Sequence, residues 1–250
     1  MTVEAIVLTR NEEHNIGDCL RSLLWADGLT VFDSGSEDGT LVVAERLGVR
    51  TLVHPFADYG SQRDAALEAA WGDWVFFVDA DERCTPELAL EVRSVVREAK
   101  AGWWVPRENY ILGRVIRHGG WYPDYQLRLL RRGAARYDPS RPVHETVLLD
   151  GDEGWLEHPL VHYNYHSLGQ FCRKQAGYSR LEVQSLCRAG EVPRVAGLLS
   201  RPYHEFRHRY FELGGYREGI RGLALCLFLA WYKARAYACY LASARDRPAL

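Results

Sequence analysis

Residues 74–82 have the sequence Trp74-Val75-Phe76-Phe77-Val78-Asp79-Ala80-Asp81-Glu82, an apolar run that ends in three acids within four residues. Five consecutive apolar residues are typical of a strand that is buried on both faces of a parallel sheet. In open parallel sheets, ligands bind beyond the carboxyl ends of the strands, which is where these acids fall. The stretch therefore predicts an α/β fold and indicates the sheet edge at which a site is expected.

The first hundred residues alternate between strand-like and helix-like spacing of their apolar residues. This alternation predicts a mostly parallel sheet with right-handed crossovers and helices on its faces. The expected strands are 3–9, 29–32, 49–53 and 74–78, and the expected helices are 16–25, 40–47, 61–70 and 86–100.

The alternation stops after Gly102, and residues 103–165 are rich in Trp, Tyr, Arg, His, Gly and Pro. Such a segment is typical of an irregular region that carries function. Strand-like pieces occur in it at 103–107, 126–130 and 160–165. Helical spacing then returns, and we expect helices over about 170–188, 194–212 and 217–243.

The composition is that of a globular protein: 250 residues, 47% hydrophobic and 26% charged, with a formal net charge of −2. These values argue against disorder and against a globally basic nucleic-acid binder. The charge is unevenly placed, because residues 190–250 hold ten Lys and Arg against five Asp and Glu, whereas the rest of the chain carries −7. An acidic body with a basic tail is therefore expected.

The six cysteines form no CxxC pair, and their spacing suits neither a zinc site nor a disulfide framework. We expect free thiols in a reducing cytoplasm. The N-terminal residues lack the basic region of a signal peptide. The most apolar stretch, 223–232, is too short to span a bilayer, so no transmembrane helix is expected.

Polar clusters follow three of the first four expected strands, at 9–13, 33–40 and 79–82. Because like charges repel at a shared edge, a cation is expected between them, and Asp79 and Asp81 have the spacing to converge on one hard metal ion with a diphosphate. Simpler explanations exist for the other acids. Asp38 and Thr40 precede a helix and suit capping, and residues 33–36 suit a plain turn.

The second half adds Gly119-Gly120-Trp121-Tyr122-Pro123-Asp124, with flat aromatic faces for sugar or base stacking and an acid placed to act as a general base. Histidines occur at 144, 162 and 166, and Arg128 is a candidate phosphate ligand. The chain contains no Gly-x-Gly-x-x-Gly after the first strand, no P-loop and no Gly-x-Ser-x-Gly elbow. These absences argue against a dinucleotide oxidoreductase, a P-loop kinase and an α/β-hydrolase.

Three motifs in this order, residues 9–13 (TRNEE), 33–40 (DSGSEDGT) and 78–82 (VDADE), resemble family 2 glycosyltransferases of the GT-A fold. The later segments 120–129 (GWYPDYQLRL) and 143–145 (VHE), with the Arg-rich tail, resemble the lipopolysaccharide core glucosyltransferase branch (the WaaE/KdtX-like group). The resemblance covers essentially the whole chain. It implies a GT-A catalytic domain over 1–166, with a nucleotide-sugar-binding half (1–101) and an acceptor and catalytic half (102–166), followed by an amphipathic helical region over 167–250.

The resemblance also implies roles for individual residues. The nucleotide-sugar would be held by Thr9, Asn11, Glu12, Asp33, Arg63, Asp79, Ala80, Trp121 and Arg128. Asp81 would bind Mg²⁺ or Mn²⁺ with His162, for which His166 is the alternative, and Asp124 would be the catalytic base, for which Glu145 is the alternative. The implied activity is inverting transfer of a sugar, glucose from UDP-glucose at branch level, to a lipopolysaccharide core or other surface glycan.

Two other functions stay open on the sequence, namely a sugar-nucleotide nucleotidyltransferase and a non-catalytic nucleotide- or glycan-binding module. The expected partners are a nucleotide-sugar, with a UDP-sugar favoured, and a glycan or glycolipid acceptor, but no nucleic acid. The basic and aromatic C-terminal helices suit either contact with the cytoplasmic face of the inner membrane or packing, including a homodimer.

Overall fold

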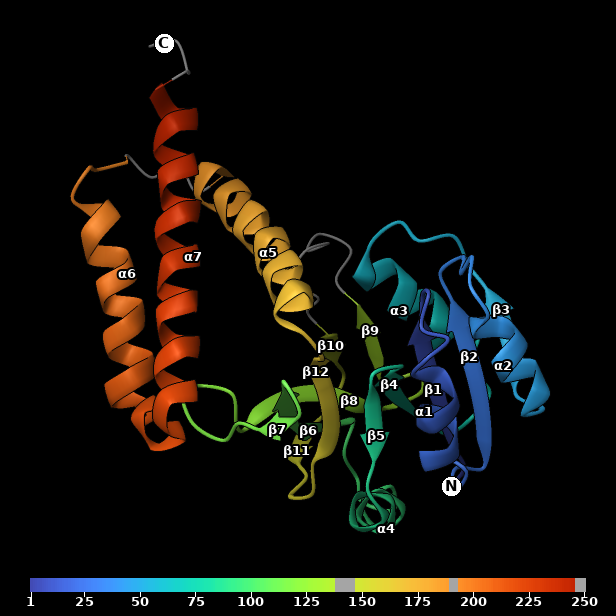
Figure 1. The fold of residues 1–250 in the computed structure, drawn as a ribbon. Helices are drawn as coiled ribbons and strands as arrows, with labels where there is room; N and C mark the ends of the chain where they lie inside the picture. The colour runs from blue at the N-terminus through green and yellow to red at the C-terminus, as the bar shows by residue number, and fades with distance from the viewer. Residues whose placement is uncertain (138–146, 189–192, 246–250) are drawn as a thin grey trace. The chain divides into compact units, whose positions relative to one another are not determined.

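A computed structural model describes residues 1–137, 147–188 and 193–245, with side chains up to residue 243 (Figure 1). The first half alternates as predicted. Its strands are β1 (Val3–Thr9), β2 (Gly28–Asp33), β3 (Arg50–Val53) and β4 (Trp74–Asp79), and its helices are α1 (Ile16–Ser22), α2 (Thr40–Arg46), α3 (Tyr59–Glu68) and α4 (Pro86–Val95).

The later strands are β5 (Glu82–Cys84), β6 (Gly102–Ile111), β7 (Arg114–Val115), β8 (Asp124–Arg131), β9 (Ala135–Tyr137), β10 (Val147–Leu149), β11 (Glu153–Trp155) and β12 (Leu160–Tyr165). The main sheet has the strand order β3-β2-β1-β4-β8-β6-β12-β5. Its first four strands are parallel, as predicted. The pairs β4–β8, β8–β6 and β12–β5 are antiparallel, and β11 pairs with β6 in parallel. The predicted α/β class, with flanking helices and a helical C-terminal part, is confirmed.

The strand β4 shows why the sheet is covered on both faces. Its alternate residues point in opposite directions, so Trp74 and Phe76 join a core cluster with α1, α2 and α4, whereas Val75 and Phe77 join a second cluster with α3. All four side chains have no exposed surface. Five apolar residues in succession are therefore required by the two-sided burial.

Local sequence also sets the starts of two helices. At α3, the Asp58 carboxylate accepts a hydrogen bond from the Ser61 N–H (2.9 Å) in a capping box. At α4, Thr85 Oγ1 accepts a hydrogen bond from the Leu88 N–H (3.2 Å), and Pro86 occupies the first helical position. The predicted extension of this helix to residue 100 is wrong, because α4 ends at Val95 and the chain turns towards β6.

The six cysteines are free, as expected from their spacing. Burial raises the pKa of the Cys19 thiol well above its usual value and that of Cys84 to about 12. Both thiols are therefore kept protonated, and they pack as small apolar side chains.

The chain forms two compact units, each of which is described by itself. The first unit contains residues 1–108 and 124–163, and the second contains the described parts of 109–123 and 164–250. The segment 109–123 thus groups with the C-terminal helices. Within the second unit, Gly119 N–H donates to the Leu213 carbonyl (2.8 Å), and Glu218 Oε1 accepts from the N–H groups of Arg117 (2.9 Å) and His118 (3.0 Å).

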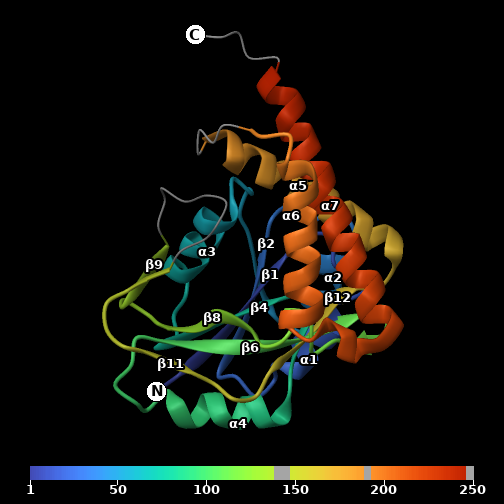
Figure 2. The ribbon, with the colours of Figure 1, turned by 90° about the vertical axis from the view of Figure 1, so that its left-hand side faces the viewer.

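The second unit is built on α5 (Leu168–Arg188), α6 (Gly197–Arg207), the π-helical turn η1 (His208–Glu212), the 3₁₀ turn η2 (Gly215–Glu218) and α7 (Gly219–Arg245). These elements agree closely with the three predicted helices. Figure 2 shows α6 and α7 running side by side, in agreement with their extensive contacts. No helix in the described residues is long and apolar enough to cross a membrane.

Candidate functional site

The loops after β1 and β2 are joined to each other by side-chain hydrogen bonds. Asn11 adopts a left-handed backbone conformation (φ 55°), which asparagine tolerates better than most residues. Its N–H donates to Ser36 Oγ (2.8 Å), and its Oδ1 accepts from Glu37 N–H (2.8 Å). The two motifs predicted to bind the nucleotide-sugar are therefore one connected structure.

Asp33 holds the backbone of the loop after β2 by hydrogen bonds to its carboxylate. Its carboxylate has no exposed surface and accepts hydrogen bonds from the N–H groups of Gly35 (2.8 Å) and Ser36 (2.7 Å). The turn that the sequence left open as the simpler explanation is thus present. Contact of Asp33 with a nucleoside stays a prediction.

Thr9 presents a different situation at the end of β1. Its side chain is buried, and within the described part of the chain its hydroxyl has no hydrogen-bond partner. A buried hydroxyl without a partner is uncommon in native proteins and is explained when a ligand supplies the partner. This observation fits the predicted contact of Thr9 with a nucleotide-sugar.

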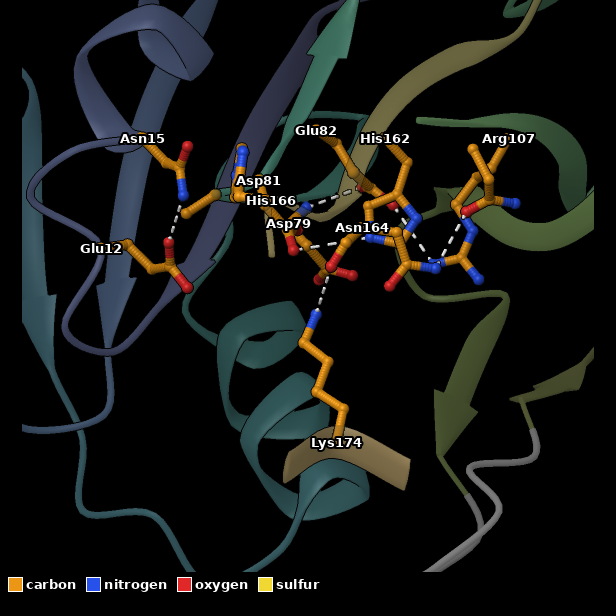
Figure 3. Close-up of polar contacts among 12 residues, drawn as sticks. Glu12, Asn15, Asp79, Asp81, Glu82, Arg107, His162, Asn164, His166 and Lys174 are labelled. Carbon is orange, nitrogen blue, oxygen red and sulfur yellow. Dashed lines mark hydrogen bonds and ion pairs between the residues drawn. The ribbon is translucent and has the colours of Figure 1, made fainter. Parts of the chain in front are cut away.

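The remaining residues of the two loops are held by hydrogen bonds between side chains and the backbone and between side chains. Glu12 N–H donates to Thr40 Oγ1 (2.8 Å), and Glu12 Oε2 accepts from Asn15 Nδ2 (2.7 Å; Figure 3). Although partial burial of Asp38 opposes its ionisation, hydrogen bonds from Thr40 and from Glu13 N–H lower the pKa of its carboxyl. Asp38 Oδ1 also accepts from the Thr40 N–H (3.0 Å), which forms a turn before α2. The predicted capping role of Asp38 and Thr40 is wrong, because the N-cap of α2 is Gly39 and has no side-chain cap.

Asp79, at the end of β4, is paired with two arginines. Arg63 Nη2, on α3, lies 3.1 Å from Asp79 Oδ1, and Arg128 on β8 contacts both carboxylate oxygens of Asp79. Burial disfavours the charged carboxylate, but the guanidinium groups of Arg128 and Arg63 outweigh it and hold the pKa of Asp79 far below its usual range. Asp79 is therefore an anion with cationic partners supplied by the protein itself.

Glu82 is the central member of this ion-pair network and has no exposed surface. It accepts from the Asp79 N–H (2.9 Å), from Arg128 Nη2 (2.9 Å) and, at longer range, from Arg107 Nη1 (3.4 Å). Figure 3 shows Glu82 with Asp79 and Arg107. Because it binds both the backbone and the arginines, Glu82 fixes the turn that carries Asp79 and Asp81.

Asp124 is linked to the same network through Arg107. Its Oδ2 accepts from Arg107 Nε (3.0 Å) and Nη2 (2.6 Å), and its Oδ1 accepts from Gln126 Nε2 (3.0 Å). The antiparallel register of β6 and β8 places Arg107 opposite Asp124. The predicted base is therefore the first residue of a strand, with a fixed orientation.

Asp81 and His162 are brought together from distant parts of the sequence. Asp81 Oδ2 lies 3.5 Å from His162 Nε2, and both side chains are largely buried, with 17% and 9% of their surface exposed (Figure 3). His162 is in register with Glu82 across β12 and β5, which explains how it reaches the acidic turn. No group of three or more His, Cys, Asp or Glu arranged for a metal occurs among the described residues.

The other predicted residues occupy varied positions. Ala80 is buried in the core, with its carbonyl bound by Arg83 Nη1 (2.9 Å). Trp121 and the alternative histidine, His166, belong to the second unit, where the Trp121 carbonyl accepts from Asn109 Nδ2 (2.8 Å). Glu145 lies outside the described residues.

The predicted site residues did not include Glu82 and Arg107. Glu82 is the third acid of the opening stretch, and its burial became evident only from the sheet. Arg107 has no local signal, because its importance comes from pairing with Asp124, 17 residues away. An excess of acids at one sheet edge does indicate that buried cations must balance them.

Comparison with known proteins identifies the class of enzyme. The sequence model of the family "Glycosyl transferase family 2" matches residues 4–136, more than half of the chain. The chain belongs to this family, as the motifs predicted, and is a glycosyltransferase. It is similar to the lipopolysaccharide core biosynthesis glycosyltransferase LpsC of Rhizobium meliloti (strain 1021), with 31% identity over 89% of this chain and 85% of LpsC.

The chain is also similar to a second relative and, over part of its length, to two solved structures. An uncharacterized glycosyltransferase of Rickettsia bellii (strain RML369-C) is 26% identical over 85% of this chain and 78% of its own. Among solved structures, S. aureus TarS 1-349 in complex with UDP-GlcNAc is 26% identical over 46% of this chain and 37% of its own, with a TM-score of 0.39. Glucosyl-3-phosphoglycerate synthase of Mycobacterium tuberculosis in complex with Mn²⁺ and UDP gives 26% identity, 44% coverage of both chains and a TM-score of 0.36. The chain thus spans less than half the length of either solved structure.

Proposed function

We propose that this glycosyltransferase is inverting and metal-dependent, and that it transfers glucose from UDP-glucose to a lipopolysaccharide core or other bacterial surface glycan. The observation that carries the proposal is the Asp81–His162 pair beside the ordered loops of β1 and β2. The similarity to LpsC supports the class of acceptor.

The residues present fit a divalent cation. A carboxylate and an imidazole, Asp81 and His162, are two suitable ligands, and diphosphate oxygens and water would complete the coordination of Mg²⁺ or Mn²⁺. When bound, the cation neutralises charge on the departing nucleoside diphosphate. Asp79, which already has two arginine partners, is kept as a proposed contributor to the nucleotide-sugar site, near the ribose and the metal.

The chain's own groups then have defined tasks. Thr9, Asn11, Glu12 and Asp33 would hold the nucleoside. Asp124, oriented by Arg107, accepts the proton of the acceptor hydroxyl while that oxygen bonds to the anomeric carbon and the bond to the diphosphate oxygen breaks. A single displacement from the opposite face inverts the configuration. Glu145 remains the alternative base.

The remaining assignments follow from this proposal. We propose a GT-A catalytic domain over 1–166, divided at 101/102, and a helical region over 167–250. Arg63, Ala80, Trp121 and Arg128 are kept as proposed contributors to the nucleotide-sugar site. The enzyme would act in the cytoplasm, on an acceptor presented at the inner membrane, and a homodimer stays an untested prediction.

Incubation with UDP-glucose, UDP-galactose, UDP-N-acetylglucosamine and GDP-mannose in the presence of Mn²⁺ tests the proposed function. We expect release of UDP, fastest from UDP-glucose, measured by a coupled nucleotide assay. Release of pyrophosphate from a sugar phosphate and a nucleoside triphosphate would instead indicate a nucleotidyltransferase. Tight nucleotide binding without turnover would indicate a binding module.

Replacement of His162 by alanine tests the metal site. Loss of one of two protein ligands is expected to weaken Mn²⁺ binding in the presence of UDP by about tenfold or more, as measured by calorimetry. His158→Ala is the matched control, because His158 is 45% exposed and pairs with Glu91 (2.9 Å). Equal Mn²⁺ affinity in the two variants would remove His162 from the metal site.

A further inference from the structure

One face of α7 consists of exposed apolar side chains. Ile220, Leu227 and Trp231 are 84%, 52% and 53% exposed, and their spacing of seven and four residues places them on one side of the helix. Ala224 and Phe228 lie on the same side and are also exposed. We call these five residues the α7 apolar face, which is about 16 Å long at ~1.5 Å rise per residue.

The neighbouring sides of α7 already pack within the second unit, and Phe228, at the edge of the apolar face, contacts Phe171 of α5 (ring centroids 6.1 Å apart). Leu225 and Tyr232 belong to a buried cluster that includes Phe171 of α5, and Tyr237 belongs to another that includes Leu198 of α6. The helix therefore has its own core contacts with α5 and α6. The α7 apolar face is additional surface, and a contiguous apolar patch of this kind usually marks an interaction site.

The charges along α7 have one sign. Over its 27 residues the helix contains Arg221, Lys233, Arg235 and Arg245 and no Asp or Glu. Lys233 is paired with Glu182 of α5 (2.5 Å), whereas the Arg235 guanidinium lies over the Trp231 ring, 5.9 Å from its centre. Exposed Arg221 and Arg235 thus flank the apolar face with positive charge.

We propose that the α7 apolar face binds the surface of an anionic lipid bilayer. Leucine, isoleucine and tryptophan side chains would enter the interfacial layer, and the arginines would meet lipid phosphates. A second copy of the chain suits this face less well, because it would bring the same positive charges together without acids to offset them. The helix is not apolar enough to span the bilayer, which is consistent with a surface position.

The inference adds to the proposed function by stating how the enzyme reaches an acceptor anchored in a membrane. Vesicle binding involves no sugar transfer, so failure of one proposal is distinguishable from failure of the other. Because the side chains of the α7 apolar face are exposed, we expect that replacing them changes vesicle binding without unfolding the protein.

The test is flotation of the full-length protein with vesicles of phosphatidylcholine containing phosphatidylglycerol, or of phosphatidylcholine alone. We expect binding to the anionic vesicles, and a fall in the partition coefficient of about tenfold or more for Leu227→Glu and for Trp231→Glu. Leu90→Glu on α4 is the matched control, because Leu90 is 73% exposed and lies in the first unit. Thermal unfolding of each variant would verify the fold.

The proposal is overturned if both α7 variants bind the anionic vesicles as strongly as the wild type does. It is also overturned if the wild type does not bind these vesicles. Size-exclusion chromatography with light scattering tests whether a second copy of the chain binds the α7 apolar face instead. A wild-type dimer that becomes a monomer in Leu227→Glu would assign the face to a second copy and overturn the membrane proposal.

Discussion

Replacing Arg128 by methionine is expected to lower the free energy of unfolding by about 3–5 kcal/mol. Arg128 is 3% exposed and binds Asp79 and Glu82, the second of which has no exposed surface. Methionine fills similar space but leaves both carboxylates without their main cationic partner. Urea unfolding at pH 7, followed by circular dichroism, gives the difference.

The same variant should show a distinct pH dependence. In the wild type the pKa of Asp79 lies far below its usual range, so its ion pairs contribute at every pH above about 4 and are lost only as the pH falls towards the folded-state value. In Arg128→Met the Asp79 carboxyl becomes easier to protonate, and lowering the pH relieves its less fully paired charge. The stability difference between wild type and variant should therefore narrow from pH 7 to pH 4.

Arg21→Met provides the control for loss of a guanidinium. Arg21 forms an ion pair with Asp18 (2.6 Å), but their side chains are 61% and 69% exposed, and such pairs contribute at most about 1 kcal/mol. If Arg128→Met costs no more than Arg21→Met, the ion-pair network does not stabilise the fold as described.

Asp124→Asn is expected to reduce kcat by about 10²–10⁴-fold while nucleotide-sugar binding is retained. Asparagine keeps the shape of the side chain but cannot accept the proton of the acceptor hydroxyl. The measurement pairs steady-state turnover with calorimetric titration of UDP, which separates chemistry from donor binding. Restored turnover at higher acceptor concentration would indicate a binding defect instead.

Two further variants complete this test. Asp152→Asn removes an exposed carboxylate of the same unit and should leave turnover unchanged. Glu145→Gln tests the alternative base. Near-normal turnover in Asp124→Asn together with a large loss in Glu145→Gln would transfer the role to Glu145.

The parallel half of the fold was predictable because each of its elements has a local signal. The strand β1 has the predicted bounds, and β4 extends only one residue further than predicted. The short strands β5, β9, β10 and β11 were not predicted, because three residues are too few to show a period. The strands β5 and β11 pair with the longer strands β12 and β6, whereas β9 and β10 pair with each other, so all four depend on contacts that are distant in the sequence.

The acidic residues of the site were easier to predict from the sequence than the arginines that pair with them. Asp79 and Asp81 were predicted together because they stand two residues apart at the carboxyl end of one strand, where ligands bind in a parallel sheet. The partners Arg63, Arg107 and Arg128 come from one helix and two strands, so their convergence depends on tertiary register. A linear pattern contains no signal for such register.

The grouping of residues 109–123 with the C-terminal helices has a practical consequence. Ile111 and Ile116 are buried in one cluster with Phe171, Leu225 and Tyr232, all of which come after residue 166. A shortened protein that stops at 166 would leave both isoleucines facing water and the Gly119 loop without its Leu213 anchor. The helices thus act as a folding partner for an internal segment, and their removal would invite aggregation rather than yield a minimal enzyme.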